Sequence, residues 1–195
     1  MSKLSGGGSL PPRPGLIPLA RGFVGGFVSI FCLALLSTLT EHQFLMAPFG
    51  ATCVILFAAS ALPVAQPRNV VGGHVLSALV GFAGYYLFLD GSMDTSITGV
   101  FSKPDPILVA VAMAVSVGVA IAAMQFLRVV HPPAGANPLV IIMAGTAGHM
   151  PGFDFMVFPV LLGSILLVGI AAFINNVGEG QKWPVYWHGM GQKRD

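Results

Sequence analysis

The sequence predicts an all-α protein that crosses a membrane several times. The chain is 55% hydrophobic and only 8% charged, whereas soluble domains are about 25% charged. Four of its apolar stretches are uninterrupted and close to the roughly 20 residues that a transmembrane helix needs. Two further apolar stretches are shorter and are interrupted by proline and glycine. We therefore expect a polytopic protein with four full transmembrane helices and two broken half-helix segments.

The four uninterrupted stretches predict the full transmembrane helices. A helix rises about 1.5 Å per residue, so each stretch is long enough to span about 30 Å of hydrocarbon. No charged residue falls at the centre of any of them, where it would be costly. They are residues 22–40, 70–89, 106–126 and 159–175.

The two interrupted stretches, residues 44–62 and 131–149, resemble each other. The motif Pro-x-Gly-Ala occurs in both, at Pro48 and at Pro133, an offset of 85 residues. The same offset places the first long stretch on the third. Because a fixed offset between similar segments indicates internal repetition, we predict two related units, over about 22–89 and 106–175. Each unit would hold a span, a break, a short helix and a second span.

Each break predicts a helix that begins inside the membrane. Asn137 is a favourable N-cap and Pro138 a favourable first helical residue, and Thr52 can cap a matching helix over residues 53–62. A helix of about 12 residues is about 18 Å long, or half of the hydrocarbon core. We therefore expect two helix N-termini near the middle of the membrane, each preceded by an extended segment.

Two topologies are compatible with these segments. If each interrupted stretch crosses the membrane, there are six crossings and the two units are inverted, as in many transporters. If each turns back, there are four crossings. Lysine and arginine gather on one side in both arrangements, so the positive-inside rule does not separate them. We favour six crossings, with a flexible cytoplasmic tail over residues 1–21 and a cytoplasmic tail over 176–195.

The breaks are also where we expect a solute to bind. Irregular backbone is tolerated at membrane depth only where it is buried in protein or lines a cavity. A helix N-terminus carries unpaired N–H groups and about half a positive charge, and two facing each other would attract an anion. Glycine would let the solute approach the backbone. The predicted substrate-binding residues are Pro48, Gly50, Ala51, Thr52, His131, Pro133, Gly135, Ala136 and Asn137.

Four further residues, Arg68, Asn69, His74 and Arg128, are candidates for the pathway or its gate. The two arginines lie at the ends of spans, where they can attract anions or anchor the helices at the interface. His74 can carry a proton, because histidine titrates near neutral pH, or it can be a core residue bonded to a carbonyl. His131 can orient the break, bind solute or take a proton.

Other classes of protein find little support in the sequence. It has no Gly-x-Ser-x-Gly motif, phosphate loop or intramembrane pair of carboxylates, so we do not expect an enzyme. Without Cys-x-x-Cys or His-x-x-x-His spacing we expect no metal, and we expect no cofactor. A net charge of +2 does not suggest a nucleic-acid partner.

The string His-Pro-Pro-Ala-Gly-Ala-Asn-Pro at residues 131–138 resembles the signature of the HPP family of integral membrane proteins. Residues 47–51 and 66–74 also resemble that family's pattern, and the likeness covers roughly residues 20–175. The resemblance implies four transmembrane helices. Because members from cyanobacteria and chloroplasts are associated with nitrite transport, it also implies nitrite as the substrate.

These observations predict a transporter or channel for a small monovalent anion in a bacterial inner membrane. Nitrite is implied by the resemblance, whereas the preference for a small anion follows from the helix dipoles. One alternative is a channel or carrier for another small solute, such as formate, nitrate or a neutral molecule. Another is a structural or sensory membrane protein that transports nothing. Because one subunit makes a thin bundle in the bilayer, we also expect a homo-oligomer.

Overall fold

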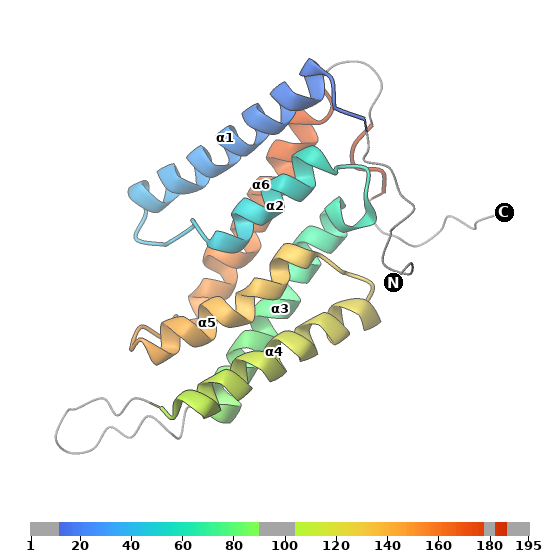
Figure 1. Cartoon of the computed structure of the whole chain (residues 1–195). Helices are drawn as coiled ribbons and strands as arrows, with labels where there is room; N and C mark the ends of the chain where they lie inside the picture. The colour runs from blue at the N-terminus through green and yellow to red at the C-terminus, as the bar shows by residue number, and fades with distance from the viewer. Residues whose placement is uncertain (1–11, 90–103, 178–181, 187–195) are drawn as a thin grey trace, which may run out of the picture.

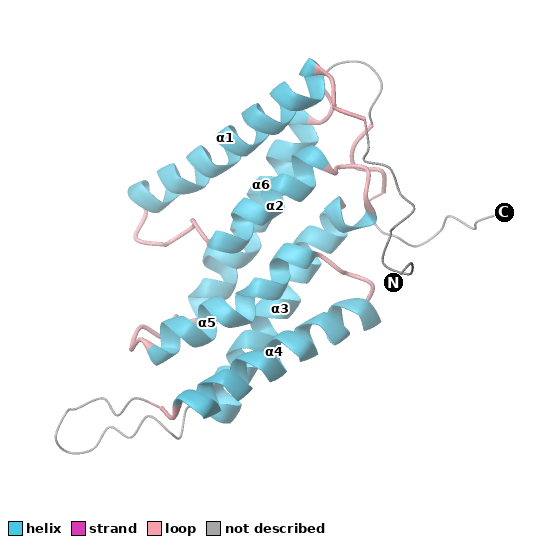
Figure 2. Ribbon diagram, viewed as in Figure 1, coloured by secondary structure: helices cyan, strands magenta, loops and turns pink. Residues whose placement is uncertain are grey.

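The computed structural model describes residues 12–89, 104–177 and 182–186, and the regular elements in these ranges are all helical (Figures 1 and 2). The predicted all-α class is therefore confirmed. The α-helices are α1 (Leu16–Leu39), α2 (Ala47–Ala58), α3 (Pro67–Phe88), α4 (Pro106–Phe126), α5 (Asn137–Thr146) and α6 (Leu162–Ile174). The shorter segments are the 3-10 helices η2 (Pro63–Ala65), η4 (Pro132–Ala136) and η5 (Phe153–Met156) and the π-helical η6 (Val157–Leu161).

Four of the described helical stretches are long and apolar enough to cross a membrane, as predicted. They are α1, α3, α4 and the stretch Phe153–Ile174, which ends in α6. The bounds of α4 are those predicted from the sequence. The helix α3 begins at Pro67, before the predicted start at residue 70, because proline is favourable in the first turn of a helix. The helix α1 begins at Leu16, within the segment that the sequence assigns to a tail.

The fourth long stretch is irregular over its first half. The 3-10 turn η5 is followed by η6, in which Phe158 has non-helical φ and ψ angles of −119° and 111°. Pro159 follows it, and proline has no N–H to continue the helical hydrogen bonds. The regular part of this span therefore begins only at Leu162.

Consecutive helices run in alternating directions along one axis of the bundle (Figure 1). The helices α1, α3 and α5 run away from the end at which α1 begins, and α2, α4 and α6 run back toward it. The two short helices therefore carry the chain through the bundle in opposite directions. Laterally, α3 packs against α4 and α5, and α6 packs against α1 and α2.

The starts of the two short helices differ from the prediction. The helix α2 begins at Ala47 after the N-cap Met46, so that Thr52 lies in its second turn and does not cap it. Asn137 has the α-helical angles −59° and −43°, follows the 3-10 helix η4, and makes no capping bond. The predicted caps and extended segments are therefore wrong. The physical reason is that proline is compatible with a first helical turn, so each Pro-containing motif starts a helix instead of preceding one.

Two glycines of α3 allow η4 and α5 to approach this helix closely. A Cβ atom at Gly73 would lie 2.8 Å from the Cβ atom of His131, and one at Gly81 would lie 2.8 Å from the Cα atom of Pro138. Any side chain at either position would force the two segments apart. Close packing on α3 thus fixes the position of the second break.

Candidate functional site

A cluster of buried polar side chains lies where the two short helical segments meet α3. We call Thr52, His74, His131 and Asn137 the polar cluster. Each of the four is at most 1% exposed. Thr52 comes from α2, His74 from α3, and Asn137 from α5, while His131 immediately precedes η4. The sequence prediction named all four residues, and the structure brings them together.

The hydroxyl group of Thr52 is at the centre of this cluster. Its oxygen lies 2.9 Å from Nε2 of His74 and 2.9 Å from Nε2 of His131. It also lies 3.1 Å from the carbonyl oxygen of Pro48, one turn earlier on α2. A hydroxyl group donates one hydrogen bond and accepts up to two, so it can serve only one of its two acceptors at a time.

The partners of the two imidazole rings assign a direction to these hydrogen bonds. Nδ1 of His131 lies 2.8 Å from the carbonyl oxygen of Val64, which can only accept, so Nδ1 carries the proton. In the neutral ring Nε2 of His131 is then an acceptor, and Thr52 donates to it. The amide nitrogen of Asn137 lies 3.1 Å from Nδ1 of His74 and donates to it, so Nε2–H of His74 donates to Thr52. The bonds therefore form one directed chain, from Asn137 through His74, Thr52 and His131 to Val64.

Asn137 also ties α5 to the backbone of α3. Its amide nitrogen lies 3.0 Å from the carbonyl oxygen of His74 and 3.0 Å from the hydroxyl oxygen of Ser77. Its amide oxygen, in contrast, is buried without a hydrogen-bond partner. A buried acceptor without a partner costs about 1–3 kcal/mol. The cluster therefore retains one acceptor that a donor could satisfy.

Apolar packing holds His74 in place on its remaining side. The ring of Phe49, from the first turn of α2, meets the ring of His74 edge to face, with centroids 5.0 Å apart and planes 74° apart. The two histidine rings have centroids 5.1 Å apart. Since rotamers locked by packing preorganise a site, the imidazole of His74 is fixed between Thr52 and Asn137, one residue from each short helix.

At one end of the bundle, the start of α3 is bonded to the loop that precedes η4. Nη2 of Arg68 donates to the carbonyl oxygen of Leu127 at 3.0 Å, and Nδ2 of Asn69 donates to that of Val130 at 2.9 Å. We call this pair of contacts the arginine latch. Because Leu127 is the C-cap of α4, the guanidinium group also lies at the negative end of a helix dipole.

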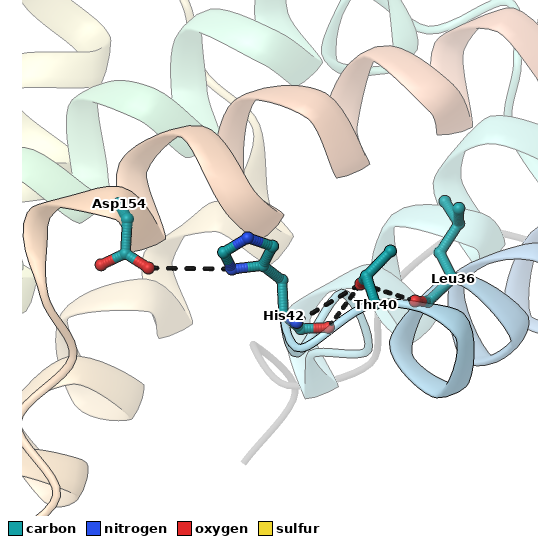
Figure 3. A network of polar contacts seen from close by, with 4 residues as sticks. All are labelled: Leu36, Thr40, His42 and Asp154. Atoms are coloured by element: carbon teal, nitrogen blue, oxygen red, sulfur yellow. Dashed lines mark hydrogen bonds and ion pairs between the residues drawn. The ribbon is translucent and has the colours of Figure 1, made fainter.

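At the opposite end, the start of η5 contacts the loop that precedes α2 (Figure 3). Nδ1 of His42 lies 3.8 Å from a carboxylate oxygen of Asp154, and the ring of His42 stacks on that of Phe158, with centroids 4.3 Å apart. We call this set of contacts the histidine latch. Thr40 holds the loop by donating to the carbonyl oxygen of Leu36 at 2.7 Å and accepting from the backbone N–H of His42 at 3.3 Å.

The other predicted site residues lie outside the polar cluster. Pro48 and Pro133 are buried beside it, whereas Gly50 and Ala51 are exposed on the outer face of α2. Gly135 and Ala136 are partly exposed on η4. Of the pathway candidates, Arg68 and Asn69 form the arginine latch. Arg128 is exposed at the end of α4, with a left-handed φ of 56°.

Three participants were missed by the sequence analysis. The carbonyl of Val64 fixes the tautomer of His131, and His42 and Asp154 form the second latch. The repeat offset could have indicated the latch, because His42 and Asp154 lie 85 residues from Leu127 and Asn69, respectively. No sequence signal indicates Val64, because a backbone acceptor depends on the fold alone.

Neither the polar cluster nor its surroundings resemble a metal centre. No group of three or more histidine, cysteine, aspartate or glutamate side chains suited to a metal ion occurs within the described ranges. An open cavity of about 590 Å³ lies elsewhere, between α1 and α6, and is lined by apolar residues such as Val28, Ile170 and Phe173. The cluster itself is closely packed.

Comparison with known proteins places this architecture among membrane proteins. The family model described as "HPP, transmembrane region" matches residues 11–184. A transmembrane protein of Dictyostelium discoideum is 34% identical over 95% of the chain, and a second one from the same organism is 32% identical over 91%. The chain spans 56% and 58% of the lengths of these two relatives. No solved structure matches the chain.

Proposed function

The chain belongs to the HPP transmembrane family, and from that premise we propose that it moves a small monovalent anion across a bacterial inner membrane. Nitrite is the first candidate, and the route passes between the two short helical segments. The observation that carries the proposal is the position of His74, which is hydrogen-bonded to Thr52 of α2 and to Asn137 of α5. Buried polar groups within a membrane domain are costly and therefore mark functional sites.

The chemistry of the cluster favours an anion over a cation. Hydroxyl, imidazole N–H and amide N–H groups can donate to an anion, and the described carboxylates, Glu41, Asp105 and Asp154, lie at helix ends away from it. The cluster residues also lie in or directly before the first two turns of α2 and of η4–α5, where backbone N–H groups make the potential positive. A dry interior strengthens this potential.

We further infer that the two units are inverted repeats. The offset of 85 residues places the N-cap of α2, Met46, on the N-cap of η4, His131. It also places one latch on the other, because in each the loop before a short helix contacts the start of the other unit's second long helical stretch. Since α2 and α5 run in opposite directions (Figure 1), six crossings follow if both short segments complete their passage.

The charge distribution supports cytoplasmic termini. The basic residues Arg21, Arg68 and Arg128 lie at the end of the bundle where α1 and α3 begin and α4 ends, and the three described carboxylates lie at the other end (Figure 1). Positively charged loops remain in the cytoplasm. We therefore place the arginine latch on the cytoplasmic side and the histidine latch on the outer side.

The close packing of the cluster favours a carrier that opens over a permanent channel. The described residues fill the space between α2, α3 and η4, so an anion can reach Thr52 only when one of the flanking loops moves. The latches lie at opposite ends, so releasing one at a time would expose the cluster to one side at a time. Gly50 and Gly135 face outward, and a neighbouring subunit in the expected homo-oligomer would shield their backbone from lipid.

The test is nitrite uptake by purified protein in liposomes, with two variants of the second break. We expect Asn137→Leu to reduce protein-dependent uptake at least tenfold, because it removes the donor that binds His74 and Ser77. Gly135→Leu should reduce uptake as well, because a bulky side chain would occupy the proposed route. Gly118→Leu on α4 is the matched control, since a Cβ at Gly118, as at Gly135, meets nothing within 4 Å.

Uptake by Asn137→Leu and Gly135→Leu equal to that of the parent protein would contradict the site. Absence of uptake by the parent for nitrite, nitrate and formate alike would contradict the proposed function, and would favour the structural or sensory alternative. Uptake of formate or nitrate in preference to nitrite would retain the route and change the substrate. Monodisperse elution of each variant in detergent controls for folding.

A further inference from the structure

We propose that the anion crosses together with one proton, which the polar cluster accepts at His131, so that the transported charge is zero. This inference rests on the proposed function and deepens it by naming the co-substrate. It is carried by the two alternative acceptors of the Thr52 hydroxyl group, Nε2 of His131 and the carbonyl oxygen of Pro48.

In the proton-free state the hydrogen bonds of Thr52 and the two rings are satisfied by one directed chain. Thr52 donates to Nε2 of His131 at 2.9 Å and accepts from Nε2–H of His74 at 2.9 Å. Nδ1–H of His131 donates to Val64, and Nδ1 of His74 accepts from Asn137. No ring carries a net charge in this arrangement, which suits a site without a fixed counter-ion.

Adding one proton to Nε2 of His131 requires only a rotation of the Thr52 hydroxyl. His131 then donates to Thr52, and Thr52 turns its own proton to the carbonyl oxygen of Pro48, 3.1 Å away. The threonine oxygen accepts from both rings, within its capacity of two. The protonated and proton-free states therefore share the same heavy-atom positions and the same number of satisfied groups.

The surroundings of the cluster determine how many protons it takes. The titratable groups that face each other are the two imidazoles, with centroids 5.1 Å apart, so a second proton would place two cations side by side. The elements packed around them contribute Thr52 and Phe49 from α2, the Val64 carbonyl beside η2, and Asn137 from α5. Arg68, nearer the end of α3, is bonded to Leu127, and the described carboxylates lie at distant helix ends.

The absence of a facing carboxylate in the described residues couples the proton to the anion. An imidazolium ion in a dry interior is costly unless an opposite charge accompanies it. A small anion bound beside the cluster would supply that charge, and the proton would in turn favour the anion. Each therefore raises the affinity for the other by the same factor. The anion and the proton then enter and leave as a pair.

The experiment measures nitrite and proton influx by the full-length protein in liposomes that contain a pH-sensitive dye. Protein-free liposomes give the background for permeation of nitrous acid. We expect one proton per nitrite above that background, and no change in the initial rate when valinomycin and a potassium gradient make the interior positive. Protein-dependent nitrite flux without protons, accelerated by the positive interior, would overturn the coupling and leave the proposed function intact. A lack of any protein-dependent flux would overturn the proposed function itself.

Two substitutions at Thr52 test the role of the hydroxyl group. Thr52→Val keeps the shape but removes the group that rotates, so we expect proton-coupled uptake to fall at least tenfold. Thr52→Ser keeps the hydroxyl and should retain one proton per nitrite. Thr146→Val, on α5 outside the cluster, is the matched control. Unchanged coupling in Thr52→Val would overturn the role of Thr52, and the proton count of the parent protein decides the inference even where this variant fails to fold.

Discussion

The loop before α2 and the loop before η4 occupy matching places at opposite ends of the bundle, but they are held by different chemistry. The arginine latch consists of two direct hydrogen bonds to backbone carbonyls, and its Asn69 is only 6% exposed. The histidine latch is a pair of side chains 3.8 Å apart, with His42 39% and Asp154 62% exposed. Exposed ion pairs contribute little to stability, whereas buried hydrogen bonds are costly to lose.

This difference indicates which end opens more readily. Releasing the arginine latch leaves the carbonyls of Leu127 and Val130 without these donors, whereas His42 and Asp154 can exchange their contact for water. We therefore infer that the end with the histidine latch opens at the lower cost. Repetition of the fold thus supplies two equivalent loops, and the residues on them make the two ends unequal.

The largest effect on this comparison is expected from Asn69→Leu. It removes the donor to Val130 and leaves a carbonyl in a buried place without its partner, so unfolding should become easier by about 1–3 kcal/mol. Thermal unfolding in detergent measures the change. Gln125→Leu, on the exposed face of α4, is the control and should leave the melting temperature nearly unchanged. Equal stability of Asn69→Leu and the control would remove the basis for calling the arginine latch the firmer one.

The C-terminal ends of α4 and α5 provide a second test of the loop before η4. Both helices end in a Schellman motif with a left-handed residue, Arg128 with φ 56° after α4 and Gly148 with φ 81° after α5. A side chain in this conformation costs about 1 kcal/mol, which glycine avoids. Gly148→Ala should therefore lower the stability by about 1 kcal/mol, and Arg128→Gly should raise it by about 0.5–1 kcal/mol.

Both changes are measured by thermal unfolding at one pH. Destabilisation by Arg128→Gly would show that the arginine side chain holds the loop through contacts that outweigh its backbone strain. In that case the loop before η4 would depend on a third residue besides Arg68 and Asn69.

The smallest effect is expected from Asp154→Asn in the histidine latch. Histidine gains its positive charge between about pH 8 and pH 5, and only then does the aspartate attract it as an ion. The stability of the parent protein relative to Asp154→Asn should therefore be near zero at pH 8 and rise to at most about 0.5 kcal/mol at pH 5.5. Melting temperatures of both proteins across this range provide the measurement. A difference larger at pH 8 than at pH 5.5 would refute the ion pair.

Much of the fold could be predicted from the sequence because the membrane imposes length and composition directly. The bounds of α4 follow from an uncharged apolar run between Asp105, which caps the helix by accepting from the backbone N–H of Ile107, and a run that ends before Arg128. The starts of α2 and η4 could not be predicted as well, because proline is compatible both with an extended segment and with a first helical turn.

The polar cluster could be predicted only in part. Thr52 and Asn137 were named because they share a place in the repeat, and His74 because a histidine within a span is unusual. The bonds among them join residues 22, 63 and 79 positions apart, and such distant contacts depend on how the helices pack. The same is true of Val64, whose carbonyl determines the tautomer of His131.

The most direct test of the route between the short helices is chemical modification of Gly135→Cys during nitrite transport. In a background with Cys32→Ala and Cys53→Ala, reaction with a charged methanethiosulfonate should abolish protein-dependent flux, and nitrite should slow that reaction. Gly118→Cys on α4 should react without loss of flux. Full labelling of Gly135→Cys with flux unchanged would contradict a route between the two short helices.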